Sequence, residues 1–307
     1  VWDAVKSSAD YAGKVAAARA FNAQSEEQGG HMRRGVGIAP GKYTCYRAIH
    51  TGIRVRVNIL DDGSIQVHSG GAEIGQGLLT KVGQCVCATL TEQLRLSQPL
   101  DLDLVRFREF DSGHNPNQGN AGGSTTSEAA VHAAEKACKE LAARLKPWKK
   151  GSDDWLEIVK NAKIGVVGGI TAFAFKVDFD VAGFYLPPFD EAFYPVFGAS
   201  VAEVQIDTLT GETKVLSSHI VMDSGKSLNP AIDIGQVEGA YVMGLGQLLL
   251  EKVVYDEADG SLKTDNTWTY KPPGINDIPE NFTVELLDFE RDRVNNGFGA
   301  VFPCLRR

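Results

Sequence analysis

Residues 53–90 read IRVRVNILDDGSIQVHSGGAEIGQGLLTKVGQCVCATL and decide the expected fold. Apolar and polar residues alternate on both sides of Asp61-Asp62-Gly63, which is typical of a β-hairpin with a tight turn. After the glycine-bearing stretch 70–77, apolar residues at 78, 82, 85, 86 and 90 fall on one face of a helix. The segment therefore predicts a hairpin, a glycine-rich turn and a helix, in that order.

A second stretch repeats this order. Residues 199–223 predict another hairpin around the turn TLTG, and residues 231–253 predict another helix. The triplets Ile74-Gly75-Gln76 and Ile234-Gly235-Gln236 occupy matching places near each junction of loop and helix. We therefore expect an α+β fold of two hairpin-plus-helix lobes related by approximate internal duplication, with a first lobe over residues 1–197 and a second over residues 198–307.

The remaining segments have weaker patterns. Thr125 and Glu128 fit a capping box at the start of a helix that runs to residue 145. The other expectations are a charged amphipathic helix over 1–20, a polar loop over 22–35, a strand over 35–47, strand over 163–179 and loop over 182–197.

Composition excludes several classes of protein. The chain has 307 residues, of which 43% are hydrophobic and 23% charged, as in ordinary globular proteins. With 31 Lys and Arg against 39 Asp and Glu, the net charge of −8 disfavours binding to nucleic acid or an anionic membrane surface. No apolar stretch reaches the roughly 18 residues of a membrane span, and the first twenty residues lack a secretory core. We expect a cytoplasmic protein whose first residue, Val1, looks internal to a longer chain.

The cysteines and histidines do not suggest a metal or catalytic centre. The five cysteines, at 45, 85, 87, 138 and 304, form no CxxC pair and no zinc or iron–sulfur spacing. Cys85, Cys87 and Cys138 fall inside helical patterns, which predicts small core residues. The six histidines, at 31, 50, 68, 114, 132 and 219, are scattered, so none receives a role. Walker A, GxGxxG, GxSxG and HExxH motifs are also absent from the sequence.

Three glycine-bearing turns precede three predicted helices, at residues 70–77, 122–126 and 225–235. Such turns expose backbone N–H groups, and the helix dipole adds partial positive charge, so each could hold a phosphate or an oxyanion. Gln76 and Gln236 add neutral amides that both donate and accept hydrogen bonds, which suits a heterocycle edge or an oxo ligand. The alternative is that each amide caps backbone groups between packed elements; spacing alone leaves both readings open.

A family resemblance adds to this reading. The segments HSGGAEIGQGLLTKVGQ, GNAGGSTTSEAAVHAA, IVMDSGKSLNPAIDIGQVEGAYVMGLGQ and TYKPPGINDIPENFTVELL resemble the C-terminal molybdenum-cofactor domain of the xanthine dehydrogenase and aldehyde oxidase family, over essentially residues 1–290. The resemblance implies a large domain of the molybdenum hydroxylase type that binds a molybdenum–molybdopterin cofactor. It further implies hydroxylation of aldehydes or N-heterocycles such as purines, with oxygen taken from water.

The resemblance assigns cofactor contacts residue by residue. The implied contacts are Gly75, Gln76, Gly122, Gly123, Ser124, Thr126 and Gln236. No side chain of this sequence is implied as a direct ligand of the metal. The 2Fe-2S centres and the FAD of such enzymes are expected on other parts of a full enzyme, because no cysteine pattern here could hold a cluster.

One functional group of the family is missing. The general-base glutamate lies in a GE-containing turn after the last strand, whereas this sequence ends NNGFGAVFPCLRR and its last glutamate is Glu290. We therefore expect the second lobe to be truncated before that turn and the isolated chain to be inactive. It should expose an apolar interface toward the remainder of the hydroxylase, and the full enzyme is expected to be a homodimer. The alternative is a non-catalytic, truncated remnant that at most binds cofactor or a partner chain.

Overall fold

The computed structural model describes residues 1–46, 52–108, 111, 113, 118–163, 165–167, 170–172, 177–186, 193–225 and 227–287. The helices are α1 (Trp2–Ser8), α2 (Tyr11–Glu27), α3 (Leu78–Leu94), α4 (Thr126–Leu145), α5 (Trp155–Lys163) and α6 (Pro230–Leu245). The strands are β1 (Met32–Tyr46), β2 (Ile53–Ile59), β3 (Ile65–Ser69), β4 (Val105–Phe107), β5 (Gly165–Val167), β6 (Ile170–Ala172), β7 (Asp180–Tyr185), β8 (Phe193–Asp207), β9 (Thr213–Asp223) and β10 (Asn281–Leu286). The fold is therefore of the α+β class.

The chain forms two compact units, which are described separately. The described residues of unit 1 fall within Val1–Tyr43 and Pro195–Asn296, and those of unit 2 within Thr44–Tyr194. Residues 1–43 thus group with the second hairpin, whereas the expected lobe 1–197 joined them to the first. The described helices include none that is both long and apolar enough to cross a bilayer.

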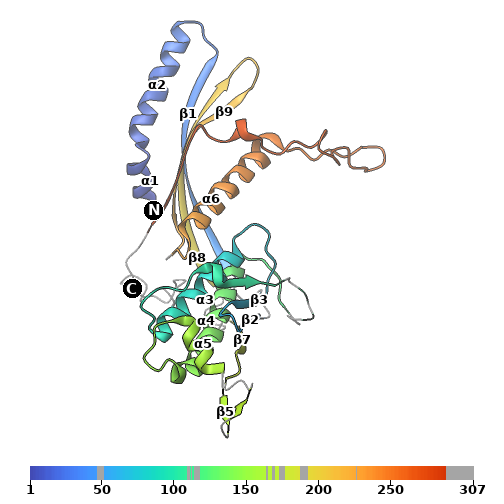
Figure 1. Ribbon diagram of the computed structural model, residues 1–307. Helices are drawn as coiled ribbons and strands as arrows, with labels where there is room; N and C mark the ends of the chain where they lie inside the picture. Colours follow the sequence, from blue (N-terminus) through green and yellow to red (C-terminus); the bar gives the residue numbers. More distant parts are fainter. Residues whose placement is uncertain are drawn as a thin grey trace. The chain divides into compact units, whose positions relative to one another are not determined.

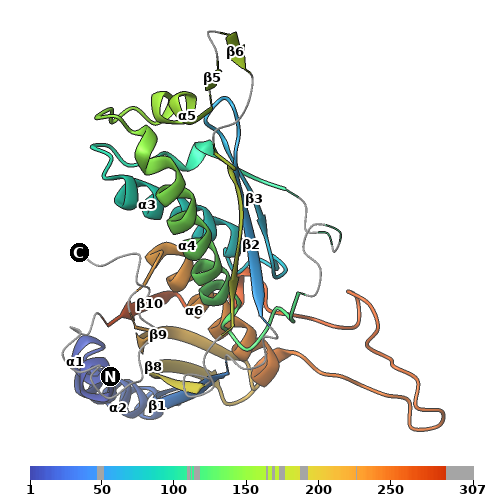
Figure 2. The same cartoon turned by 90° about the horizontal axis from the view of Figure 1, so that it is seen from below.

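Unit 2 contains a four-stranded sheet in the order β4-β3-β2-β7, with α3 and α4 along one face (Figure 2). The predicted hairpin is confirmed: β2 and β3 pair antiparallel, with Val57 opposite Val67. Gly63 has φ 82°, and Ser64 donates its backbone N–H to Oδ1 of Asp62 at 2.9 Å, which closes the turn. Residues of β2 and β3 alternate between buried and more exposed positions, as the period of two requires.

The core of unit 2 lies between this sheet and the helices. Nine residues of α3 and thirteen of α4 are buried, among them Leu78, Leu90, Leu141 and Leu145. Helix α4 packs close to β7 because β7 has a glycine there: a Cβ on Gly183 would lie 1.8 Å from the carbonyl oxygen of Ala133. The unit is thus a well-packed two-layer structure.

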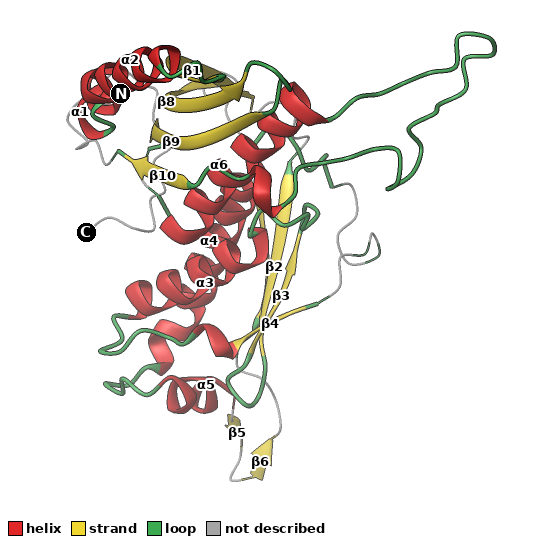
Figure 3. Ribbon diagram, turned by 90° about the horizontal axis from the view of Figure 1, so that it is seen from above, coloured by secondary structure: helices red, strands yellow, loops and turns green. Residues whose placement is uncertain are grey.

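Unit 1 is built on the sheet order β1-β8-β9-β10. The expected second hairpin is confirmed as the antiparallel pair β8 and β9, with Ala199 opposite Val221. Helices α1 and α2 cover one face of the sheet and α6 lies on the other (Figures 1 and 3). A small buried cluster of Val5, Ala9, Ala199, Val201 and Val221 joins α1 to the sheet.

Polar contacts hold α2 to the same face of the sheet. Lys14 donates from Nζ to Oγ of Ser217 at 2.9 Å and pairs with Glu203 at 3.4 Å. Arg34 of β1 places its guanidinium over the ring of Phe21 in α2, 4.1 Å from the ring centroid. Only Ala18 of α2 is buried. The attachment of α2 therefore relies on polar and cation–π contacts more than on an apolar core.

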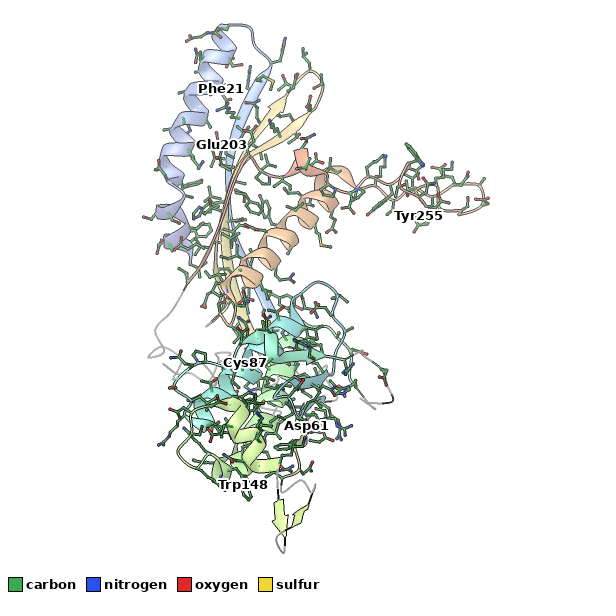
Figure 4. The ribbon with its side chains drawn as sticks, viewed as in Figure 1. Phe21, Asp61, Cys87, Trp148, Glu203 and Tyr255 are labelled. Carbon is green, nitrogen blue, oxygen red and sulfur yellow. The ribbon has the colours of Figure 1, made fainter. Side chains whose placement is uncertain are left out.

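Beyond α6, unit 1 extends into an arm. A π-helical turn, Gly246–Leu250, follows α6, and residues 251–274 form the arm. Within the arm, an isolated antiparallel β-bridge pairs Tyr255 with Leu262. Figure 4 labels Tyr255 on this arm. Large apolar side chains are exposed along α6 and the arm, including Met243 at 72%, Leu248 at 81% and Trp268 at 85%. No residue of α6 is buried within the described structure.

The structure corrects several expectations outside the two hairpins. The expected loop over 22–35 is instead the end of α2 and the start of β1, because the side chain of Asn22 bonds both backbone groups of Arg34 and keeps the turn short. The expected loop over 182–197 contains β7 and the start of β8, since β7 pairs with β2. The opening helix is broken at Asp10, whose φ is 47°. Within 163–179 the structure describes two short strands, β5 and β6.

Candidate functional site

The turn before α3 is closed by a carboxylate of the turn itself. Gly71, Gly75 and Gly77 have left-handed φ values of 84°, 99° and 74°, which glycine adopts without a steric cost. Oε1 of Glu73 accepts the backbone N–H groups of Gly75 at 3.0 Å and Gly77 at 3.1 Å, and Oε2 accepts that of Leu79 at 3.0 Å. The start of α3 therefore already carries an anion.

The side chain of Gln76 is bound within the same turn. Its Oε1 accepts the backbone N–H of Ile74 at 2.7 Å, and its Nε2 donates to the carbonyl oxygen of Ala72 at 2.8 Å. This is the backbone-capping arrangement that the sequence left open as an alternative to ligand binding. The amide also fixes the orientation of the loop that carries Gly75.

The turn before α4 has a different structure. Gly123 and Ser124 have φ values of 64° and 58°, so two successive residues are left-handed. Gly122 donates its N–H to Oγ1 of Thr126 at 3.0 Å. The expected helix start is confirmed, but the capping box is not, because the side chain of Thr125 makes no cap hydrogen bond. Glu128 is instead buried, and its Oε2 accepts the hydroxyl of Tyr194 at 2.6 Å.

Burial and the neighbouring Glu128 carboxylate raise the pKa of Tyr194. The Tyr194 hydroxyl therefore stays protonated and donates to Glu128 over the ordinary pH range. A buried carboxylate in the first turn of α4 also suits the positive end of the helix dipole.

The two turns of unit 2 lie against each other. A Cβ on Gly71 would lie 2.6 Å from Cγ2 of Thr126, and a Cβ on Gly70 would lie 1.9 Å from Oε1 of Gln118. Oε1 of Gln118 accepts the backbone N–H of Arg54 at 3.2 Å. Nε2 of Gln118 is buried and, among the described residues, has no hydrogen-bond partner. The turn at 70–77 thus packs against Thr126 of the second turn and against the Gln118 carboxamide, whose buried Nε2 is a spare donor.

The arrangement in unit 2 fits an anionic, oxygen-rich cofactor. Gly70 and Gly71 allow close packing, since a side chain there would collide with Gln118 or Thr126, whereas a Cβ on Gly75 or Gly122 would meet nothing within 4 Å, so the backbone is open at one glycine of each turn. The unsatisfied donor of Gln118 calls for an acceptor atom, because a buried donor without a partner is costly. A hollow at the other end of the β2–β3 hairpin, lined by Asp61, Asp62, Asp178 and Asp180, includes neither glycine-bearing turn.

The third turn belongs to unit 1 and leads into α6. Asn229 is the N-cap of α6, and its side chain accepts the N–H of Ile232 at 3.1 Å. Ser227 donates to Oδ2 of Asp233 at 2.5 Å. Gln236 lies on an exposed position of α6. The start of α6 is therefore capped by its own residues, like that of α3.

Cys85, Cys87 and Cys138 are core residues, as expected. These three and Cys45 are buried and form no disulfide among the described residues, and burial raises the pKa of Cys87 to about 11. His132 stacks on the ring of Tyr185 with centroids 4.6 Å apart. The described residues contain no group of three or more His, Cys, Asp or Glu side chains that could hold a metal ion. Cys304 and Glu290 lie outside the described residues.

Sequence reasoning missed Glu73 and Gln118. The alternation of glycine with an acid over Gly71-Ala72-Glu73-Ile74-Gly75 is a signal for a turn that binds its own carboxylate. Glu73 nonetheless stands five residues before Leu78, outside the usual N-cap position. Gln118 could not be found from sequence, because its contact with Gly70 joins segments far apart in the chain.

Comparison with known proteins defines the class to which this fold and these turns belong. Residues 4–279 match the family of molybdopterin cofactor-binding domains. The chain belongs to this family.

Among curated relatives the chain is similar to enzymes that act on aldehydes. It is 38% identical over 294 residues to "Probable aldehyde oxidase 3" of Oryza sativa subsp. japonica, covering 95% of this chain and 20% of that protein. It is 38% identical over 299 residues to "Indole-3-acetaldehyde oxidase" of Arabidopsis thaliana, covering 94% and 21%. The chain thus spans about one fifth of the length of these relatives.

Solved structures share the fold. Quinoline 2-oxidoreductase from Pseudomonas putida 86 superposes with a TM-score of 0.69 at 20% identity, covering 94% of this chain and 38% of that one. Carbon monoxide dehydrogenase from Oligotropha carboxidovorans superposes with a TM-score of 0.71 at 18% identity, covering 93% and 37%. At this identity the likeness concerns the fold alone.

Proposed function

We propose that the chain supplies cofactor-binding loops of a molybdenum hydroxylase that oxidises aldehydes with oxygen from water. The observation that carries this proposal is the contact of the two glycine-bearing turns of unit 2, Gly71 against Thr126, next to the Gln118 carboxamide with its spare Nε2 donor. Membership of the cofactor-binding family and similarity to aldehyde oxidases support it. N-heterocycles, including purines, form the second substrate class, which rests on the family resemblance alone.

In this proposal, seven residues of the chain contact the cofactor: Gly75, Gln76, Gly122, Gly123, Ser124, Thr126 and Gln236. When bound, the cofactor supplies the two-electron redox chemistry and the oxygen transfer. The turn at 122–126 would provide backbone N–H donors to the cofactor, and fixed donors of this kind favour charge that develops on oxygen. Gln118 joins these residues as an additional donor. No side chain of the chain is proposed as a direct metal ligand.

The chain alone is proposed to lack turnover. The general-base glutamate of the family is not matched within residues 1–307, and a positioned base contributes on the order of 10² to 10⁴ in rate. The rest of the hydroxylase would supply the base, the substrate pocket, the 2Fe-2S centres and the FAD. A homodimeric, cytoplasmic enzyme is part of the same proposal.

The exposed apolar surface of α6 and the arm supports the proposal that the chain is part of a larger protein. Met243, Leu248 and Trp268 expose most of their surface, and a concentration of exposed large apolar side chains is typical of an interface. Since the chain covers about a fifth of its relatives, the remainder of the same enzyme is the partner that fits.

The connectivity of the two units supports the approximate internal duplication. In unit 2 the hairpin β2–β3 leads through α3 to β4, which pairs parallel with β3. In unit 1 the hairpin β8–β9 leads through α6 to β10, which pairs parallel with β9. The sheet orders β4-β3-β2-β7 and β10-β9-β8-β1 also correspond position by position.

The test is cofactor content. The chain is produced with cofactor synthesis supplied, and bound molybdenum and pterin are measured for the wild-type protein and for the Gln76→Ala/Gln236→Ala double variant. We expect cofactor in the wild-type protein and at least a severalfold loss in the double variant. Equal content in the two proteins would remove the assignment of these amides, and absence of cofactor from both would favour the truncated remnant.

A further inference from the structure

The Glu73 carboxylate makes more backbone contacts than any ordinary helix cap requires. Its two oxygens accept three N–H groups, from Gly75, Gly77 and Leu79, all at 3.0 to 3.1 Å. These groups span the last turn residues and the first turn of α3. A single side chain thus determines the path of the backbone on both sides of Gln76.

Without these hydrogen bonds, the backbone of residues 72–79 would not stay in the observed conformation. Gly75 and Gly77 are both left-handed, with φ of 99° and 74°, and glycine has the greatest freedom to leave such a state. The Gln76 side chain adds two further bonds, to Ala72 and Ile74. Glu73 and Gln76 therefore form one hydrogen-bonded loop, residues 72–79, in which the carboxylate is the acceptor for the helix start.

We propose that Glu73 is a positioning residue of the cofactor site: its carboxylate is a built-in anion that occupies the start of α3 and holds the 72–79 loop in its binding conformation. The proposal rests on the proposed function, because the loop contains Gly75 and Gln76. The proposal also gives the two turns of unit 2 different roles. Glu73 occupies the amides at the start of α3, so acceptor atoms of the cofactor would meet the turn at 122–126 and the free donor of Gln118.

The chemistry requires a carboxylate rather than a carboxamide. A carboxylate offers acceptors only, and hydrogen bonds to a charged acceptor are stronger than neutral ones. In a Glu73→Gln protein one oxygen becomes an NH2 group that faces backbone N–H donors. At least one of the three bonds is then lost, and its donor is left without an acceptor in a partly buried turn.

The experiment combines removal of the side chain with chemical rescue. The Glu73→Ala, Glu73→Gln and wild-type chains are compared with and without acetate, at constant ionic strength set by chloride. Hydrogen exchange of Gly75, Gly77 and Leu79 reports the loop, and molybdenum and pterin content report the site. The matched control is Glu92→Ala, which removes an exposed glutamate from the other end of α3.

We expect exchange of the three amides to accelerate roughly ten- to a hundredfold in Glu73→Ala. Cofactor content should fall severalfold, and acetate should restore part of both losses by entering the vacated carboxylate position. Glu73→Gln should show intermediate losses without rescue, because its side chain fills that position; it also serves if Glu73→Ala fails to fold. Glu92→Ala should match the wild type throughout.

Two results would overturn the proposal, and they differ from failure of the proposed function. Normal cofactor content in Glu73→Ala with accelerated exchange would show that Glu73 is only structural. Loss of cofactor without acetate rescue and without a change in exchange would show that it acts by another route. Cofactor missing from the wild-type chain would instead refute the proposed function, and the positioning role would fall with it.

Discussion

Helices α3 and α6 stand at corresponding points of the two units. Each follows a hairpin and a glycine-bearing turn and precedes a strand that returns parallel to the hairpin. Nine of the 17 residues of α3 are buried, whereas none of the 16 residues of α6 is. Yet α6, with Ile232, Ile234, Val237, Val242 and Met243 along its length, is no less apolar in sequence.

The difference between the two helices lies in how much of their apolar surface is covered. An apolar helix in a finished structure is covered, because burial of apolar surface is the main favourable contribution to folding. Unit 2 satisfies this rule internally, with α4 packed against both α3 and the sheet. In unit 1 the apolar side chains of α6 and the arm stay exposed, and the proposed larger enzyme would cover them. The comparison predicts that the same type of substitution has a large effect in unit 2 and a small one in unit 1.

The largest expected effect separates the two helices directly. Leu90→Ala in α3 removes a fully buried side chain and should destabilise unit 2 by about 2–5 kcal/mol, through lost burial and a residual cavity. Met243→Ala in α6 should change the stability of the chain by less than about 0.5 kcal/mol, because the side chain is already exposed. Urea unfolding of both variants measures the difference. Equal losses would show that α6 is covered within this chain.

The next effect tests the contact of the two turns. Gly71→Ala places a Cβ 2.6 Å from Thr126 at a left-handed φ of 84°, whereas Gly151→Ala has nearly the same φ, 83°, and nothing within 4 Å. Both variants place alanine at nearly the same unfavourable φ, so the difference between their stabilities reports the steric contact with Thr126. We expect Gly71→Ala to cost about 1–3 kcal/mol more than Gly151→Ala and to lose cofactor selectively. Similar melting temperatures for the two variants would refute the close approach.

The sequence predicted the local elements of unit 2 and missed contacts between segments that are far apart in the chain. Local period and turn chemistry predicted the hairpin at Asp61-Asp62-Gly63 and the helices at 78 and 126, because those signals lie within a dozen residues. The segment 182–197 was read as loop because its prolines and aromatics hide the alternation, which pairing with β2 imposes. Gln118 and Tyr194 were missed for the same reason: their partners, Arg54 and Glu128, lie more than sixty residues away.

A smaller effect concerns the ion pairs of the two units. Arg56 donates from Nε to Oδ1 of Asp180 at 2.6 Å, and a second contact joins Nη2 and Oδ2. This hydrogen bond lowers the pKa of Asp180 below its usual 3.8. Stability from the pair is therefore present at neutral pH and disappears as acid protonates the folded carboxylate. Asp180→Asn should cost about 0.5–1 kcal/mol at pH 7, since both side chains are about a third or more exposed, and nothing well below pH 3.

The matched control for this pair is in unit 1. Lys214 and Glu280 form an ion pair with about half of each side chain exposed, so Glu280→Gln should have no measurable effect at either pH. Urea midpoints at pH 7 and at acid pH give both comparisons. A loss for Asp180→Asn that is independent of pH would mean that packing, and not the charge, is at stake.

The smallest expected effect concerns the reactivity of the cysteine thiols. In the sequence no cysteine falls in residues 1–43 or 195–287, so thiol labelling of the described cysteines reports on unit 2 alone. Cys87 is buried and its pKa is raised to about 11, so little reactive thiolate exists near neutral pH. We expect iodoacetamide to leave Cys85, Cys87 and Cys138 unmodified at pH 8 until unit 2 opens.

Trp268 supplies the complementary probe, because it is 85% exposed on the arm of unit 1. Its accessibility to a neutral quencher should be high in the native chain and should hardly change across the urea range that exposes the thiols. Binding of the remainder of the enzyme should reverse this order by protecting Trp268 while leaving the unit 2 thiols as they were. Thiols that react before urea is added would mean that unit 2 is no better packed than unit 1, and the contrast between α3 and α6 would then lose its physical basis.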